Sequence, residues 1–290
     1  MKLINRLLAG AVLLAVVFIG QEINPEIILS SQYLEQADIL VIKIPGKQID
    51  ELSGTFDDSK IDLFEGPSSD LFAIIGIDAK KAPGKYNLEI SFTDGYKIEK
   101  TIEVRQRHFP VTKMIVTQEL QKKGYTASKI MINIADNDNP TINKILSGYT
   151  PEAIFDESFA YPLKEIKDIG AYGNIRKSET SKIQHLGTDL EADEGTPVFA
   201  VNNGVVKLAK KLDTYGNTLI IDHGLGIFSL YLHLSEFKVS PGQSVNREEI
   251  VALSGNTGYS IAPHLHFSIK INGSSVDPLK FIEIAEKEIK

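Results

Sequence analysis

The run Ala262-Pro263-His264-Leu265-His266-Phe267 constrains the fold of this chain most, because it alternates two histidines with apolar residues. In a β-strand, residues i and i+2 point to the same face, so His264 and His266 are expected to share one side of a sheet. Burying two neighbouring imidazoles is costly unless something binds them, and a divalent metal is their commonest partner. An HxH pair alone is a weak signal, so its meaning depends on the rest of the chain.

The composition indicates a globular protein and excludes several classes of function. Of the 290 residues, 42% are hydrophobic and 24% are charged, with a net charge of −7. An acidic balance of this kind argues against nucleic acid as the main partner. The chain has no cysteine, which excludes disulfides, thiolate metal ligands and a cysteine nucleophile.

Residues 1–22 have the features of an export signal. Lys2 and Arg6 precede an uncharged apolar run over residues 7–20, the order found in signal peptides. That run is short for a membrane span, and no clear cleavage site follows it, so a signal peptide and an uncleaved signal-anchor both stay open. We therefore expect an exported protein of the periplasm, cell envelope or extracellular space, with membrane anchoring by this segment as an open alternative. The oligomeric state is not predicted.

The turn and strand pattern predicts a mainly β protein with two domains. Residues 23–36 are predicted to be a spacer. Residues 37–106 contain alternating strands separated by turns such as Pro83-Gly84 and Asp94-Gly95, which favours an Ig-like β-sandwich. This domain has no catalytic-looking cluster and is interpreted as a spacer or binding module. Residues 107–158 are expected to be a connector with short helices, and residues 159–290 an antiparallel β domain with a groove.

Two features of the connector lead to further expectations. Pro140 is expected to break any continuous helix. Asp136 and Asp138 lie in the polar run just before it. They could suggest calcium, but the remaining ligands of a calcium loop are missing, so a solvated turn is predicted. A fragment that starts near Phe155 is expected to retain the activity of the second domain.

Four of the six histidines lie in segments that together suggest one metal site. His185 and Asp189 form an HxxxD pattern, His233 follows an apolar strand, and the HxH pair comes last. Two histidines and an aspartate leave one coordination position open, as a catalytic zinc requires. The other two histidines would then be available for proton transfer and for stabilising an oxyanion.

The second domain resembles the LytM/lysostaphin-type zinc metallopeptidases of bacterial cell walls, which have the duplicated hybrid motif fold. The resemblance runs from about Phe159 to Phe281 and consists of short blocks in a fixed order. The blocks are Phe159-Ala160-Tyr161-Pro162-Leu163, Tyr172-Gly173-Asn174-Ile175-Arg176, His185-Leu186-Gly187-Thr188-Asp189-Leu190, Gly195-Thr196-Pro197-Val198-Phe199-Ala200, Asn203-Gly204-Val205-Val206, Tyr215-Gly216-Asn217, Asp222-His223-Gly224, Tyr231-Leu232-His233-Leu234-Ser235, Gly242-Gln243-Ser244-Val245, Gly255-Asn256-Thr257-Gly258, Pro263-His264-Leu265-His266-Phe267 and Val276-Asp277-Pro278.

The resemblance implies one Zn²⁺ per chain, with His185, Asp189 and His266 as ligands and His233 and His264 as catalytic residues. It also implies that the protein is a zinc metalloendopeptidase that cleaves peptide bonds of peptidoglycan. Two alternatives are a non-catalytic LytM-like activator of cell-wall amidases and a wall-binding module with a relic site. His223 and His108 are interpreted as structural and linker residues, and Arg176 as a residue that forms a salt bridge within the fold.

Overall fold

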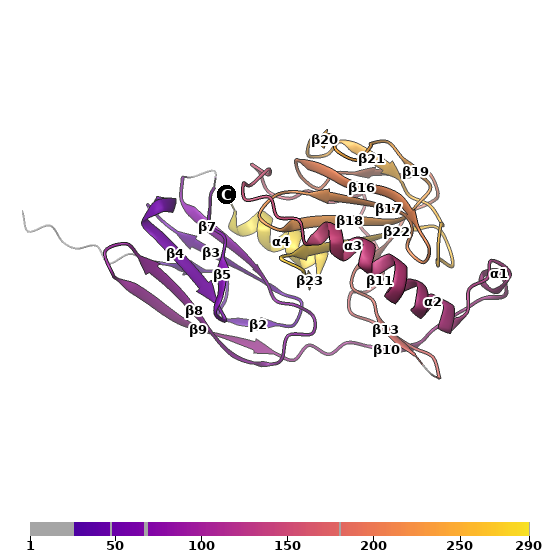
Figure 1. Cartoon of the computed structure of the whole chain (residues 1–290), viewed down its shortest axis with the longest axis horizontal. Helices are drawn as coiled ribbons and strands as arrows, with labels where there is room; N and C mark the ends of the chain where they lie inside the picture. Colours follow the sequence, from indigo (N-terminus) through magenta and orange to yellow (C-terminus); the bar gives the residue numbers. More distant parts are fainter. Residues whose placement is uncertain (1–25, 47, 67–68, 180, 290) are drawn as a thin grey trace, which may run out of the picture.

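The computed structural model describes residues 26–46, 48–66, 69–179 and 181–289. The predicted export segment, residues 1–22, lies outside the described residues. Within the described ranges, no helix has both the length and the apolar character needed to cross a membrane. Figure 1 shows a strand-rich molecule with sheets at both ends, which confirms the predicted mainly β class. The groove predicted in the second domain stays a prediction.

The N-terminal domain consists of two sheets that enclose one core. The first sheet has the order β1-β3-β7-β6, and the second has the order β2-β9-β8-β4-β5. Alternating apolar residues of both sheets, such as Leu40 and Ile90, are buried between them. The elements are β1 (Ile28–Leu29), β2 (Tyr33–Glu35), β3 (Ile39–Ile44), the short helix η1 (Ile49–Glu51), β4 (Leu52–Phe56), β5 (Ser59–Ile61), β6 (Phe64–Glu65), β7 (Leu71–Gly76), β8 (Gly84–Phe92) and β9 (Lys97–Arg105).

The N-terminal domain begins before the predicted boundary at Ala37. Strand β1 pairs with β3, and β2 pairs with β9 in parallel. Leu34 of β2 is buried in the core between the sheets. The prediction of a spacer over residues 23–36 is therefore wrong for the strands β1 and β2, because even a two- or three-residue strand is stabilised once its backbone joins an existing sheet edge.

The connector is a strand followed by a nearly continuous helical segment. It contains β10 (Val111–Lys113), α1 (Gln118–Lys122), α2 (Ala127–Asn133), the π-helical turn η2 (Ile134–Asp138) and α3 (Asn139–Leu146). Thr117 and Thr126 cap α1 and α2 through their hydroxyl oxygens, as expected of N-cap residues. Figure 1 shows the segment from α2 to α3 running across the second domain.

The expected break at Pro140 does not occur. Pro140 lies in the first turn of α3, where its missing N–H costs little, and the π-helical turn η2 joins α2 to α3. The predicted solvated turn is also wrong for Asp138, whose side chain is buried. Its carboxylate accepts hydrogen bonds from the backbone N–H groups of Asp213 and Thr214 at 2.9 and 2.7 Å.

The second domain is built on an antiparallel sheet with the order β11-β14-β22-β18-β17-β16-β20, and β23 pairs with β22. Smaller sheets have the orders β15-β21-β19 and β10-β12-β13. The elements are β11 (Asp168–Gly170), β12 (Ile175–Lys177), β13 (Lys182–Gln184), β14 (Thr188–Glu191), β15 (Pro197–Phe199), β16 (Gly204–Leu212), β17 (Gly216–Asp222), β18 (Ile227–Leu234), β19 (Glu236–Phe237), β20 (Ser244–Val245), β21 (Ile250–Leu253), β22 (His264–Ile271), β23 (Ser274–Val276) and α4 (Pro278–Glu288).

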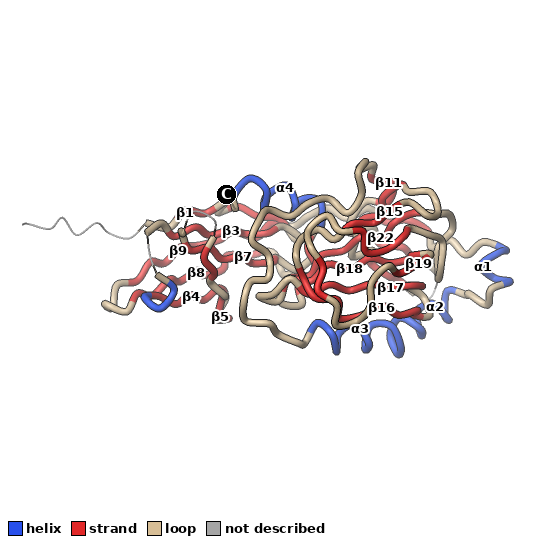
Figure 2. Tube along the Cα trace, turned by 90° about the horizontal axis from the view of Figure 1, so that it is seen from above, coloured by secondary structure: helices blue, strands red, loops and turns tan. Residues whose placement is uncertain are grey.

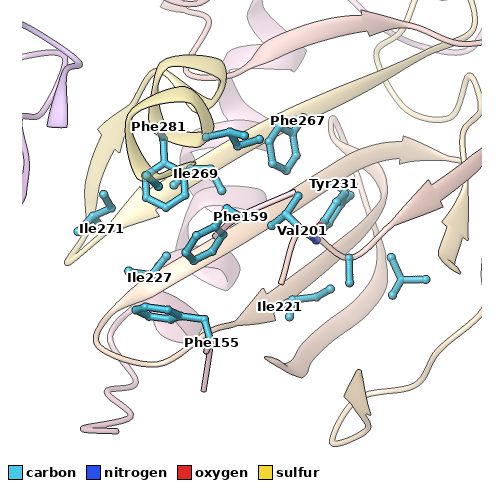
Figure 3. Packing of buried hydrophobic residues seen from close by; sticks show 14 of the residues in the cluster. Phe155, Phe159, Val201, Ile221, Ile227, Tyr231, Phe267, Ile269, Ile271 and Phe281 are labelled. Atoms are coloured by element: carbon cyan, nitrogen blue, oxygen red, sulfur yellow. Dashed lines mark hydrogen bonds between the residues drawn. The ribbon is translucent and has the colours of Figure 1, made fainter. Parts of the chain in front are cut away.

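The two domains share a hydrophobic core instead of being separate bodies. Ile39, Val41 and Phe72 of the first domain belong to the same buried cluster as Phe159 and Phe281 of the second. Figure 3 shows Phe281 of α4 and Phe159 near strand β22, which carries Phe267 and Ile269. Figures 1 and 2 show α4 where the two domains meet. Truncation at Phe155 would expose part of this core to water, so such a fragment should be less stable than the full chain. Its predicted activity stays a prediction.

Candidate active site

Two neighbouring strands bring His185, Asp189 and His266 together. In the pairing of β14 with β22, Asp189 lies directly opposite His266, so both side chains project from the same face. His185 precedes β14, and its N–H bonds to the carbonyl of Asn174. One ligand-type atom from each residue lies within 4.8 Å of the other two. The structure therefore joins the HxxxD and HxH patterns into one cluster.

The inner atoms of this cluster are very close to one another. His185 Nε2 lies 2.9 Å from Asp189 Oδ1 and 2.9 Å from His266 Nδ1, and His266 Nδ1 lies 2.8 Å from Asp189 Oδ1. All three side chains are buried, with 8–9% of each residue exposed. Three potential acceptor atoms therefore converge on one small volume.

The outer ring nitrogens fix the tautomers of both histidines. His266 Nε2 lies 3.0 Å from Ser268 Oγ, whose hydroxyl donates to the carbonyl of Leu186. Ser268 can then only accept from the ring, so His266 Nε2 carries the proton. His185 Nδ1 faces the carbonyl of Ala171 at 3.4 Å, which likewise assigns the proton to Nδ1. These hydrogen positions follow from the hydrogen-bond network, and they leave both inner nitrogens as lone pairs.

Two imidazole lone pairs and a carboxylate oxygen at this spacing would repel one another without a cation between them. Such a donor set suits a divalent transition metal, and the outer contacts to Ser268 and Ala171 are the kind that orient metal-binding histidines. Gly187 makes the close approach possible, since a Cβ there would lie 2.3 Å from both His266 Nε2 and Ser268 Oγ. The cluster therefore fits a metal ion.

Asp189 is also held from the opposite side. Arg176 Nη2 of β12 lies 3.1 Å from its Oδ2, and His264 Nε2 lies 3.5 Å from its Oδ1. Burial opposes ionisation of Asp189, but its close contacts with His185, His264 and His266 outweigh it and hold the pKa of this carboxyl well below its usual range. The aspartate is therefore an anion, and the predicted internal salt bridge of Arg176 is present.

His233 reaches the cluster through an irregularity in β18. Strict alternation would put His233 on the same face as Tyr231, which is buried in the core. Asn217 of β17 pairs with Leu234 of β18, and Leu219 pairs with Tyr231. One residue of β17 lies between these two pairs, whereas two residues of β18 lie between them. β18 therefore has one extra residue, a β-bulge, and His233 has the left-handed φ of 62°. Bulges of this kind redirect a side chain, and here Leu234 enters the core instead.

The rings of His233 and His264 face each other beside the cluster, with centroids 5.0 Å apart. His233 Nδ1 lies 2.8 Å from the carbonyl of Thr257, and His264 Nδ1 lies 2.8 Å from the carbonyl of Ala262. Each Nδ1 therefore carries a proton. The Nε2 of His233 is available as an acceptor, whereas the Nε2 of His264 faces Asp189 Oδ1 at 3.5 Å. Burial, followed by the neighbouring histidines, lowers the pKa of His233 to about 3. Burial opposes protonation of His264 too, but its contact with Asp189 raises its pKa above the ordinary value.

The remaining histidines lie outside the cluster. His223 is fully buried, and its ring nitrogens contact the carbonyl of Asn203 at 2.7 Å and Ser229 Oγ at 2.8 Å, as expected for a structural residue. His108 is exposed in the connector. Ser268 was missed by the sequence reasoning, although it stands two residues after His266 and therefore on the same strand face.

A buried His–Asp–His set beside two further imidazoles defines the kind of centre found in metal-dependent hydrolases. Residues 183–278 match peptidase family M23. The chain therefore carries a domain of peptidase family M23, the LytM/lysostaphin family, as the ordered sequence blocks predicted. This is a metallopeptidase domain.

Similar proteins support this assignment. An uncharacterized metalloprotease of Haemophilus influenzae is 43% identical over 108 residues, which are 37% of this chain and 23% of that protein. The peptidoglycan DD-endopeptidase ShyA of Vibrio cholerae is 41% identical over 96 residues, 33% of this chain and 22% of that protein. The matched region thus spans less than a quarter of these curated relatives.

A solved structure extends the likeness of fold beyond the peptidase domain. A crystal structure from Pseudomonas aeruginosa, whose name assigns it to peptidase M23, superposes with a TM-score of 0.61 at 21% identity. It covers 85% of this chain and 93% of that chain. At this level of identity the match concerns the fold alone, and it includes more of the chain than the peptidase domain.

Proposed function

We propose that the protein is a zinc metalloendopeptidase that hydrolyses peptide bonds of peptidoglycan. The observation that carries this proposal is the convergence of two imidazole lone pairs and an ionised carboxylate at 2.8–2.9 Å, next to two further imidazoles. In this proposal His185, Asp189 and His266 bind one Zn²⁺ per chain. Two nitrogens and one oxygen are ligands that zinc accepts, and a fourth position stays free for chemistry.

His233 and His264 have the properties required of proton-transfer groups. When bound, the zinc ion would polarise the scissile carbonyl and acidify a water molecule. Each of the two histidines has its Nδ1–H committed to a backbone carbonyl, so its Nε2 is oriented to accept a proton. Once protonated, the same ring can donate to the leaving amine or stabilise negative charge on oxygen.

Peptidoglycan is proposed as the substrate because relatives of the M23 domain carry names that state it, such as peptidoglycan DD-endopeptidase. A stem peptide would bind as an extended strand to a sheet-based site of this kind. The proposed location is the cell envelope or periplasm, reached through the export segment predicted at residues 1–22.

The test is digestion of defined, crosslinked muropeptides by the full chain, with the products identified by mass spectrometry. We expect cleavage by the zinc-loaded protein, none after chelation, and recovery on adding Zn²⁺. His185→Ala should abolish both metal content and cleavage, because two remaining ligands hold zinc too weakly. His108→Ala, which replaces an exposed histidine outside the cluster, is the matched control and should behave as wild type.

The opposite results would identify the alternatives. A protein that binds zinc, cleaves no muropeptide and stimulates a cell-wall amidase would be an activator. A protein that binds sacculi without zinc and without cleavage would be a wall-binding module. Either result would reject the proposed activity.

A further inference from the structure

The carboxylate of Asp138 is a buried ionisable group outside the His185–Asp189–His266 cluster. It lies in the connector, at the end of the π-helical turn η2, and only 1% of the residue is exposed. Burial outweighs its hydrogen bonds with the backbone of Thr214 and Asp213 and raises its pKa above the ordinary range. Burying a carboxylate is costly unless it is well paired, so the contacts that it makes need a reason.

Those contacts hold the turn between β16 and β17, which comprises residues 213–215. Asp138 Oδ1 accepts the N–H of Asp213, and Oδ2 accepts the N–H of Thr214, at 2.9 and 2.7 Å. Both carboxylate oxygens are therefore used by adjacent N–H groups of one turn. This arrangement fixes the turn in position and in orientation, since two bonds define a plane that one bond would not.

The same turn binds the backbone of His233. The carbonyl of Tyr215 accepts the N–H of His233 at 3.1 Å, next to the bulge at which His233 has a φ of 62°. A non-glycine residue with this φ is strained and persists only when its surroundings enforce it. The β16–β17 turn provides one of the backbone contacts that enforce it.

The turn also supports the loop that orients the His233 ring. The carbonyl of Thr214 accepts the N–H of Tyr259 at 2.7 Å. A Cβ at Gly258 would lie 2.4 Å from the backbone nitrogen of Gly216, so the loop and the start of β17 are in direct contact. In this loop the carbonyl of Thr257 accepts the Nδ1–H of His233 at 2.8 Å.

We propose that Asp138 is a positioning residue for His233, acting through the β16–β17 turn. The carboxylate holds the turn, the turn holds both the His233 backbone and the loop of Thr257, and these together orient the imidazole. The expected effect of Asp138 on catalysis rests on the proposed function. Its expected effect on the orientation of the His233 ring can be measured even in a protein without activity. The same proposal assigns the connector a role in the peptidase domain.

The decisive variant is Asp138→Asn in the full, zinc-loaded chain. Asparagine has the same shape, but its NH₂ group would face one of the two backbone N–H groups as donor against donor. Asp136→Asn is the matched control, because it removes the same charge from the same π-helical turn at an exposed position. Ile142→Val is a second control, since it loosens the packing of α3 in a buried cluster that also contacts Tyr215, but leaves the two hydrogen bonds of Asp138 unchanged.

Three measurements are compared among these proteins: zinc content, kcat and KM on a soluble muropeptide, and the ¹⁵N-histidine NMR signals of His233. We expect Asp138→Asn to retain zinc and KM, to lose about tenfold or more in kcat, and to shift the His233 ring signals. Both controls should retain wild-type kcat and ring signals, even where Ile142→Val lowers the melting temperature. Wild-type kcat and unchanged His233 signals in Asp138→Asn would overturn the proposal.

Two provisions keep the result interpretable. If Asp138→Asn does not fold, Asp138→Glu retains the charge and displaces the carboxylate by one methylene. It should show the same shift of the His233 signals and a lower kcat, and wild-type values in it would overturn the proposal. If the wild-type protein binds zinc but cleaves nothing, the proposed function fails, while the NMR comparison still tests whether Asp138 positions His233.

Discussion

The two halves of the candidate site are built in different ways. His185, Asp189 and His266 lie on or beside two regular strands, and the direct pairing of Asp189 with His266 creates their contact. His233 lies at a β-bulge, has a left-handed φ, and depends on backbone contacts from a turn and a loop. The comparison teaches that the half proposed to bind the metal follows from strand alternation, whereas the second half depends on distant segments that hold it.

The largest expected effect comes from removing a side chain of the regular half of the site. Asp189→Ala and His266→Ala should each lose the metal completely and with it all hydrolysis, because each removes one of three ligands. Metal analysis and muropeptide digestion measure this, with His108→Ala as the control. Stoichiometric zinc in either alanine variant would show that the ligand set is assigned wrongly.

Breaking the irregular half should separate catalysis from metal binding. His233→Ala and His264→Ala are expected to retain zinc and the fold and to lose at least about a hundredfold in rate, as is usual for groups that transfer protons or stabilise an oxyanion. The double variant should be little worse than the poorer single variant, because residues acting as a unit are not additive. Near-wild-type turnover in either single variant would remove that histidine from the mechanism.

Substitutions at two glycines test the same division of the site and are expected to have smaller effects. Gly187→Ala should weaken metal binding, since its Cβ would lie 2.3 Å from His266 Nε2. Gly258→Ala should leave the metal bound but lower kcat by about tenfold, because it pushes the loop away from Gly216. Gly242→Ala is the control. Gly242 has a positive φ of 87°, similar to that of Gly258, but no atom lies within 4 Å of the position of its Cβ. Equal metal affinities in the Gly187 and Gly258 variants would contradict the division of the site into two halves.

The smallest effect concerns His223, which is buried like His233 but belongs to the core. Burial lowers its pKa from 6.5 to about 4. Between these values the unfolded chain binds a proton that the folded chain does not, so the stability from His223 is present above pH 6.5 and lost as the pH falls towards 4. The loss is about 3 kcal/mol in total.

His223→Gln should be less stable than wild type near pH 7, because it alters two buried hydrogen bonds. Its free energy of unfolding should fall less steeply between about pH 6.5 and pH 4. Urea unfolding of the metal-free proteins across this range gives both quantities. Parallel pH profiles for the two proteins would show that His223 does not remain neutral in the fold, and lost hydrolysis with normal stability would make it part of the site.

The sequence by itself determined the mainly β class, the family and the face shared by His264 and His266. Strand alternation is a local property, and short motifs in a fixed order carry the family signal without any coordinates. Sequence reasoning also indicated the internal salt bridge of Arg176 and the structural role of His223. These features depend on residue type and spacing, which can be read directly from the sequence.

Only the tertiary structure decided the orientation of His233, the burial of Asp138 and the shared core of the two domains. Alternation would turn His233 into the core, and a bulge stabilised by the β16–β17 turn reverses this. Asp138 lies in a polar run that indicates solvent, yet it is buried against backbone N–H groups some 75 residues away in sequence. Contacts between segments so far apart have no local signature, because the free energy that favours them arises only when the partner segment is already in place.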